Sequence, residues 1–120
     1  MNINKELLNK SDIESLLEPV LLWSGTATVA TTLTTLDMSK YKYVVFGFVN
    51  ATDGNIIQYR KVKYQLSTMV LDFIDDDNTT CHRQISITSP TTVDVGTGYA
   101  GTSPNQNRCV LKELYGTNIL

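Results

Sequence analysis

The clearest pattern along the chain is a series of short β-type stretches separated by turn residues. β-Branched and aromatic side chains fill these stretches, and they suit the pleated surface of a sheet better than a helix. Because turn residues recur about every eight to twelve positions, we predict a mainly β fold, an antiparallel β-sandwich of jelly-roll-like type. The expected strands are Val20–Trp23, Thr26–Leu33, Tyr41–Asn50, Gln58–Leu66, Thr68–Ile74, Arg83–Thr88, Thr91–Val95 and Arg108–Tyr115. The expected turns are Ser24-Gly25, Asp37–Ser39, Asp53–Asn55, Asp75–Asn78, Ser89-Pro90 and Gly96–Gly98.

The stretch Tyr41–Asn50 is apolar on both of its alternating faces. Its even positions carry Val44, Phe46 and Phe48, and its odd positions carry Tyr43, Val45 and Val49. A strand that is apolar on both faces is covered on both, so we expect a central strand with the core on one side and a partner on the other. Gly47 inside it indicates a bulge or a close approach of a second backbone. We predict a subunit contact formed by Val44, Phe46, Phe48 and Trp23.

The first residues read as a short helix. Ser11-Asp12-Ile13-Glu14 has the spacing of a capping box, and Pro19 ends the helical pattern. Along this expected helix, Ile13, Leu16 and Leu17 form an apolar stripe. A helix this short is marginal in water by itself, so we expect it to pack on its own sheet, on a neighbouring subunit or on a larger assembly. The predicted division is a helical segment over residues 1–19 and a β-sandwich over residues 20–120.

The polar segment Gly96–Asn107 joins two expected strands and is the candidate binding loop. Long loops of this kind are usually functional or flexible. Tyr99 is an aromatic residue on which a sugar ring could stack, and Asn105, Gln106 and Asn107 could bond sugar hydroxyls. The alternative is a solvated loop whose tyrosine folds back on the sheet.

Composition limits the classes of partner. A chain of 120 residues with 42% apolar and 18% charged residues is expected to be one globular domain. The net charge is −2, and Arg60-Lys61-Lys63 reads as the solvent face of a strand, so we expect no nucleic-acid partner. The apolar runs are too short for membrane insertion. The first residues show no signal-peptide pattern, so we expect the protein to be made and kept in the cytoplasm, or released by a route other than secretion.

The residues that usually carry chemistry do not form a recognisable motif. His82 is next to Cys81, and adjacent strand residues point to opposite faces, so the two do not make a nucleophile–base pair. The acidic run Asp75–Asp77 lacks the glycine and glutamate of a calcium loop. We therefore expect no enzyme, no metal site and no cofactor. Without a signal peptide, Cys81 and Cys109 are expected to be thiols rather than a disulfide.

Two segments carry a resemblance to a known family. The order Leu22-Trp23-Ser24-Gly25, a threonine-rich strand and Lys40-Tyr41-Lys42-Tyr43-Val44-Val45-Phe46 is similar to the small β-sandwich at the distal ends of bacteriophage tail-fibre and receptor-binding proteins, and of some head-fibre proteins. A final strand like Val110–Gly116 is common in those domains. The likeness covers residues 21–49 and 108–116. It implies a homotrimer in a virion, assembled in the bacterial host cytoplasm with other virion proteins.

The functional expectation follows from these points. The first hypothesis is a non-enzymatic virion protein, a trimeric fibre or receptor-binding knob that contacts a host-surface polysaccharide. The second is a capsid decoration or head-fibre protein docked through its N-terminal segment. A third class is a free carbohydrate-binding module, which would be a monomer.

Overall fold

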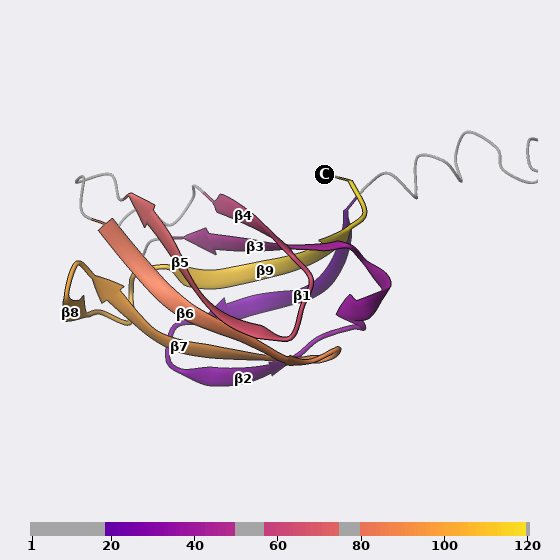
Figure 1. Ribbon diagram of the computed structural model, residues 1–120. Helices are drawn as coiled ribbons and strands as arrows, with labels where there is room; N and C mark the ends of the chain where they lie inside the picture. Colours follow the sequence, from indigo (N-terminus) through magenta and orange to yellow (C-terminus); the bar gives the residue numbers. More distant parts are fainter. Residues whose placement is uncertain (1–18, 50–56, 75–79, 120) are drawn as a thin grey trace, which may run out of the picture.

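The computed structural model describes residues 19–49, 57–74 and 80–119, and in these residues two antiparallel sheets pack face to face (Figure 1). Sheet A has the strand order β1-β9-β3-β4, and sheet B has the order β2-β7-β6-β5 with β8 beside β7. The strands are β1 (Val20–Ala27), β2 (Thr31–Thr34), β3 (Tyr43–Val49), β4 (Gln58–Lys63), β5 (Ser67–Ile74), β6 (Thr80–Ser89), β7 (Thr92–Ala100), β8 (Ser103–Pro104) and β9 (Val110–Thr117). The prediction of a mainly β fold with two antiparallel sheets is confirmed.

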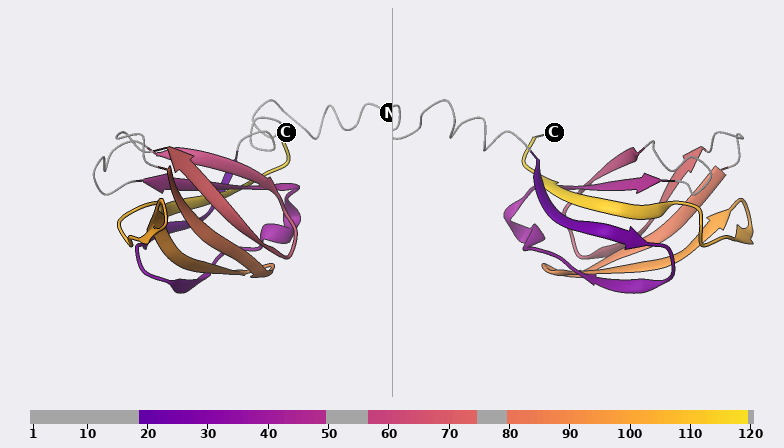
Figure 2. Two further views of the ribbon diagram at one scale, coloured as in Figure 1. Left: turned by 60° about the vertical axis from the view of Figure 1, so that its left-hand side comes forward. Right: turned by 180° about the vertical axis from the view of Figure 1, so that it is seen from behind.

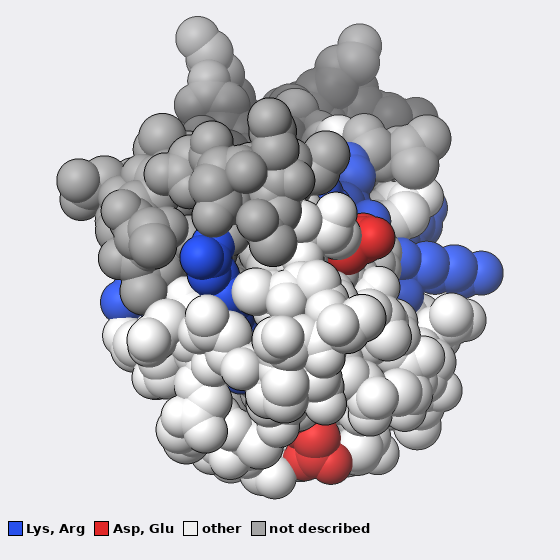
Figure 3. All heavy atoms as spheres, turned by 90° about the vertical axis from the view of Figure 1, so that its left-hand side faces the viewer, with Lys and Arg blue, Asp and Glu red and all other residues white. Residues whose placement is uncertain are grey.

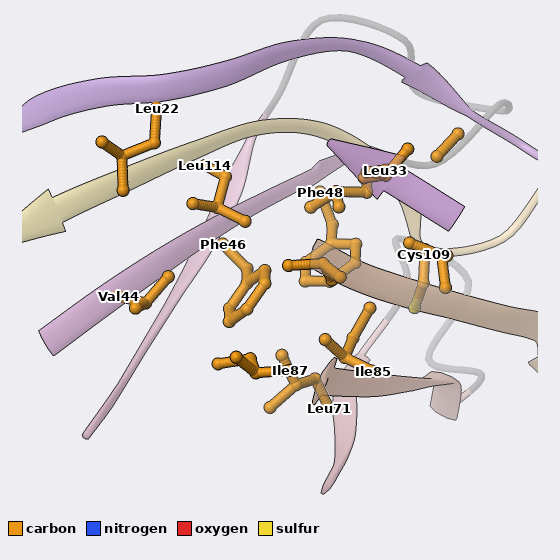
Figure 4. Packing of buried hydrophobic residues seen from close by; sticks show 14 of the residues in the cluster. Leu22, Leu33, Val44, Phe46, Phe48, Leu71, Ile85, Ile87, Cys109 and Leu114 are labelled. Carbon is orange, nitrogen blue, oxygen red and sulfur yellow. The ribbon is translucent and has the colours of Figure 1, made fainter. Parts of the chain in front are cut away.

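Strand β3 is central in sheet A, between β9 and β4, as predicted. Its even side chains point between the sheets, where Phe46 and Phe48 lie with ring centroids 6.3 Å apart (Figure 4). Phe48 also meets Phe73 of β5, with centroids 4.9 Å apart, so aromatic contacts join the two sheets. The period of two that defines a strand thus places every second residue of β3 in the core.

The chain passes from one sheet to the other at the ends of the sandwich (Figure 2). After β2, a 3₁₀ turn, η1 (Met38–Lys40), closes one end: the Ser39 N–H donates to Asp37 Oδ1 at 2.9 Å, and Met38 is fully buried. The Met38 N–H donates to the Pro90 carbonyl at 2.8 Å, which ties this turn to the β6–β7 connection. The predicted turns at Asp37–Ser39 and Ser89-Pro90 are therefore confirmed.

Two predicted turns are wrong because strands continue through them. Strand β1 runs past Ser24-Gly25 to Ala27, and a shift in its register with β9 lies between Ser24 and Ala27. The indole of Trp23 covers Gly25, since a Cβ there would lie 2.8 Å from Trp23 Cζ2. Strand β7 likewise runs through Gly96–Gly98 to Ala100, so the predicted loop begins five residues later than expected, at Gly101.

Some predictions fall on residues outside the described ranges. The N-terminal helix with Ile13, Leu16 and Leu17 is one of them, and the turns at Asp53–Asn55 and Asp75–Asn78 are the others. Within the described part, the basic residues of β4 divide between two faces. Lys61 and Lys63 point to solvent as predicted, whereas the Arg60 guanidinium lies 4.3 Å from the Phe73 ring centroid at the border of the two sheets.

Candidate functional site

The outer face of sheet A carries an aromatic groove. Val45 of β3 forms its floor, and Pro19, Tyr59 of β4 and Tyr115 of β9 line it; we call these four residues the tyrosine groove. Its volume is about 380 Å³. An adjoining hollow of about 360 Å³ shares Pro19, Val45 and Tyr59 and extends to Lys61, Thr117 and Ile119. The groove is therefore a surface feature made by three neighbouring strands and the residue that leads into β1.

A carboxylate holds the two tyrosines in place. The Tyr59 hydroxyl donates to Glu113 Oε1 at 2.6 Å, and the Tyr115 hydroxyl donates to Oε2 of the same residue at 2.8 Å. Tyr59 and Glu113 meet across Gly47 of β3, where a Cβ would lie 2.9 Å from each of their side chains. The space that Gly47 leaves is therefore taken by side chains and not by a second backbone. The predicted bulge is present as a register shift between Gly47 and Phe48.

These hydrogen bonds change the acidity of the two tyrosines. The bond to the Glu113 carboxylate raises the pKa of Tyr59 from 10.0 to about 12, with smaller contributions from desolvation and from the charge of Glu113. The same carboxylate raises the pKa of Tyr115. A carboxylate accepts a hydrogen bond from the neutral phenol and repels the phenolate, so it favours the protonated form. Both rings are therefore held neutral and oriented along the groove.

The predicted subunit contact is wrong in its choice of side chains. Val44, Phe46 and Phe48 are between 0% and 2% exposed in this chain alone, because they form the core between its own sheets. Trp23 is half-buried and packs against the same core. A second chain cannot reach the three buried side chains, whereas Val45 on the opposite face of β3 is open to the groove. The apolar pattern on both faces predicted the central strand correctly. The expected subunit contact was placed on the face that forms the core, whereas the open face is the one that carries Val45.

Tyr99 lies on a strand rather than in a loop. It is part of β7, and its ring stacks on His82 of β6 with centroids 5.0 Å apart and an angle of 10° between the planes. The pair stands on the outer face of sheet B, because the neighbouring residues Cys81 and Gly98 face inward and are buried. The prediction that Cys81 and His82 point to opposite faces is thereby confirmed.

The three amides predicted to bind sugar form a turn beside this pair. The Asn105 N–H donates to the Gly98 carbonyl at 2.7 Å, and Asn105 Oδ1 accepts from the Asn107 N–H at 3.0 Å. Gln106 is exposed, and its carbonyl accepts from Arg83 at 3.1 Å. The structure therefore brings Tyr99 and residues 105–107 to the same end of sheet B.

Arg83 is the residue with a structural role that the sequence analysis missed. Its side chain is fully buried, and its guanidinium makes five hydrogen bonds to backbone carbonyls. The acceptors are Thr28, Gly96, Gln106, Arg108 and Cys109, at 2.8 to 3.1 Å. Burial lowers the pKa of Arg83, and the carbonyl dipoles stabilise its charge. One signal in the sequence could have identified it. Every second residue of β6 points into the core, and Arg83 stands in this series with Cys81, Ile85 and Ile87.

The two cysteines meet inside the fold. Cys109 Sγ lies 3.0 Å from Cys81 Sγ, and both side chains are buried. Cys109 has a φ of 51°, a left-handed conformation that costs a non-glycine residue about 1–2 kcal/mol. The bond from Arg83 Nε to the Cys109 carbonyl, at 2.8 Å, holds this conformation.

Side chains of the types that bind metal ions are not clustered in the described residues. Among them, no group of three histidine, cysteine, aspartate or glutamate side chains is placed to hold a metal ion. At the end of the sandwich that carries β8, most of the described surface is uncharged and its Lys and Arg side chains form no single stripe (Figure 3). No helix in the described part of the chain is long and apolar enough to cross a membrane.

Comparisons with protein-family models, curated proteins and solved structures give no significant match for this chain.

Proposed function

We propose that the chain is a non-enzymatic structural protein of a bacteriophage virion, a homotrimeric fibre or receptor-binding domain. The observation that carries the proposal is the tyrosine groove on the outer face of the central strand. Tyr59 is 48% exposed there, and the exposed Leu21 lies next to Tyr115 in the β1–β9 register. Apolar surface gathered in this way is typical of protein contacts. The pairing of β1 with β9 and of β2 with β7 in two packed sheets supports the β-sandwich that the resemblance implies.

The proposed occupant of the groove is a second copy of this chain. A contact around a threefold axis is heterologous, so the groove of one copy meets a different surface of the next. Val29, Leu36 and Leu66 are exposed away from the groove and lie on three different connections, so each is a separate candidate for that second surface. Aromatic side chains that are already held by hydrogen bonds lose little conformational freedom on contact, which favours association.

Light scattering on the full chain tests this assignment. Val45→Arg places a charge on the groove floor, and we expect it to convert a trimer into monomers. Val70→Arg is the matched control, because Val70 lies on the outer face of sheet B and is 58% exposed. It is expected to remain a trimer. A native protein that is monomeric at high concentration would overturn the trimer and favour the free carbohydrate-binding module.

One observation favours the second function, capsid decoration or a head fibre. Pro19 lines the tyrosine groove, so the chain enters the sandwich at this surface. An N-terminal segment that docks on a virion through Ile13, Leu16 and Leu17 would then leave the domain from the groove side. Deletion of residues 1–18 is expected to abolish virion attachment in this case and to leave the sandwich folded. Retained attachment would rule out docking by the segment.

In this proposal, the host-surface polysaccharide binds at the end of sheet B that carries Tyr99 and residues 105–107. The stack with His82 holds the Tyr99 ring on a pleated surface, and the adjacent turn offers exposed amide groups. Titration with host-surface polysaccharide is expected to show binding that Tyr99→Ala abolishes and Tyr59→Ala retains. Equal binding by both variants would remove this site from the proposal.

A further inference from the structure

Two buried thiols lie in contact between the sheets. Cys81 belongs to β6 in sheet B, and Cys109 immediately precedes β9 in sheet A. Their sulfur atoms are 3.0 Å apart, and the side chains are 0% and 1% exposed. We infer that Cys81 and Cys109 form a disulfide that joins the two sheets when the protein meets a small-molecule disulfide as oxidant. This inference does not depend on the proposed function.

The fold itself brings the sulfur atoms together. Cys81 and Arg83 point inward from the same face of β6, and Arg83 donates to the carbonyls of Arg108 and Cys109, each at 2.8 Å. These bonds fix the left-handed backbone at Cys109, which turns its thiol toward Cys81. A cross-link therefore joins positions that are already held in place, and it needs only a small approach of the two sulfurs to reach bonding distance.

The surroundings determine when the bond can form. The hollow beside the thiols has a volume of about 10 Å³ and is lined by Phe48, Val49, Gln58 and Phe73 together with the cysteines. Such a space holds about one water molecule, so a larger reagent cannot reach the sulfurs in the closed fold. Burial also raises the pKa of the Cys109 thiol, which lowers the amount of reactive thiolate. Exchange is therefore expected during folding or local opening.

The reaction balances with oxidised glutathione. The thiolate of one cysteine attacks the glutathione disulfide, forms a mixed disulfide and releases one reduced glutathione. The second cysteine, as its thiolate, attacks the protein sulfur of the mixed disulfide and releases the other. Two protein thiols are oxidised, one glutathione disulfide is reduced, and the two thiol protons pass to the released glutathione. The product closes a loop that contains the whole of β7.

Refolding in a glutathione redox buffer tests the inference. The reduced full chain is unfolded in urea and diluted into a mixture of oxidised and reduced glutathione. Remaining thiols are then alkylated, and the mass of the product is measured by mass spectrometry. We expect an unalkylated product lighter by two hydrogen atoms, with the Cys81 and Cys109 peptides linked. Its melting temperature is expected to exceed that of the reduced protein by roughly 10 °C. Cys81→Ala and Cys109→Ala are the matched controls: each keeps one thiol, so neither can form the internal cross-link, and in oxidising buffer each is expected to remain a thiol that is alkylated or to stop at the mixed disulfide with glutathione.

Three results would overturn the inference. In the first, the refolded protein takes up two alkyl groups when it is opened in urea after oxidation. In the second, the cross-link joins two chains on a non-reducing gel. In the third, the oxidised protein melts below the reduced one. The Val45→Arg variant should give the same linked product as the native protein, because the cross-link is independent of the tyrosine groove and of any trimer.

Discussion

Arg83 joins parts of the chain that strand pairing leaves apart. Each of its five N–H groups donates to a carbonyl, and the acceptors lie in the β1–β2 connection, in β7 and in the segment before β9. Four of these carbonyls lie outside the strands, and a carbonyl group left unpaired in the interior is costly. Arg83 therefore performs for these segments the role that a neighbouring strand performs in a sheet.

Replacing Arg83 is expected to cost more stability than replacing any half-exposed arginine. Arg83→Met removes all five hydrogen bonds, and we expect a loss of about 3–5 kcal/mol in the free energy of unfolding. Arg83→Lys retains at most three donors on one nitrogen, so it should also be clearly destabilised. Urea denaturation measures both. Arg60→Met is the control, with an expected loss below about 1 kcal/mol; similar losses at the two positions would contradict the role given to Arg83.

Glu113 gives the tyrosine groove a measurable response to pH. Because the folded-state pKa of Tyr59 is raised to about 12 from 10.0, its bond to Glu113 contributes stability fully below pH 10. This contribution is lost as the pH rises from 10 to about 12. Glu113→Gln removes the charge and is expected to lower the pKa of Tyr59. Ultraviolet titration of the phenolates, with Tyr59→Phe as reference, checks the shift; identical curves for the native protein and Glu113→Gln would refute it.

At the scale of the element, β7 depends on a glycine that leaves room for Arg83. A Cβ on Gly98 would lie 2.5 Å from Arg83 Nη2 and 2.6 Å from the carbonyl oxygens of Asn105 and Arg108. Gly98→Ala is therefore expected to displace the arginine and to cost at least about 2 kcal/mol. Gly96→Ala on the same strand meets Gln84 at 3.3 Å and should cost less. Thermal melts of both variants test the order, and a larger loss at Gly96 would reverse the interpretation.

The same strand shows where sequence patterns stop being informative. Strand β3 was predictable because its side chains carry the alternation that burial requires. The second half of β7 was not predictable, since Gly98 leaves room for Arg83 and Gly96 lies against Gln84, and a glycine carries no hydrophobic signal. The turn expected at Ser24-Gly25 failed for a related reason, because packing of Trp23 over Gly25 overrides local turn preference.

The candidate site was predictable only in part. Its central strand could be found from the apolar pattern, but the choice of face could not, because Val44 and Val45 are equally apolar in the sequence. Glu113 and Tyr115 lie on β9, so their meeting with Tyr59 depends on strand order, which local patterns do not contain. Arg83 occupies a position that the alternation of β6 predicts to be buried, but a charged side chain is rarely expected in a core.

At the scale of the whole molecule, association through the groove would couple stability to concentration. If copies bind one another only when folded, the melting temperature rises with protein concentration. We expect this rise for the native protein and for Val70→Arg, and its absence for Val45→Arg. Differential scanning calorimetry over a hundredfold range of concentration is a suitable measurement. A native melting temperature that is independent of concentration would argue against assembly.

The pairing of β1 with β9 has a mechanical consequence. Val20 lies opposite Gly116, so the start of the first strand and the end of the last lie side by side (Figure 2). Force applied between these two points would break the hydrogen bonds between β1 and β9 one after another, which requires only a low force. Force applied between this end and the β8 tip would instead shear many bonds at once. A domain tethered at this end and held at the β8 tip would therefore resist pulling far better than one stretched between the start of β1 and the end of β9.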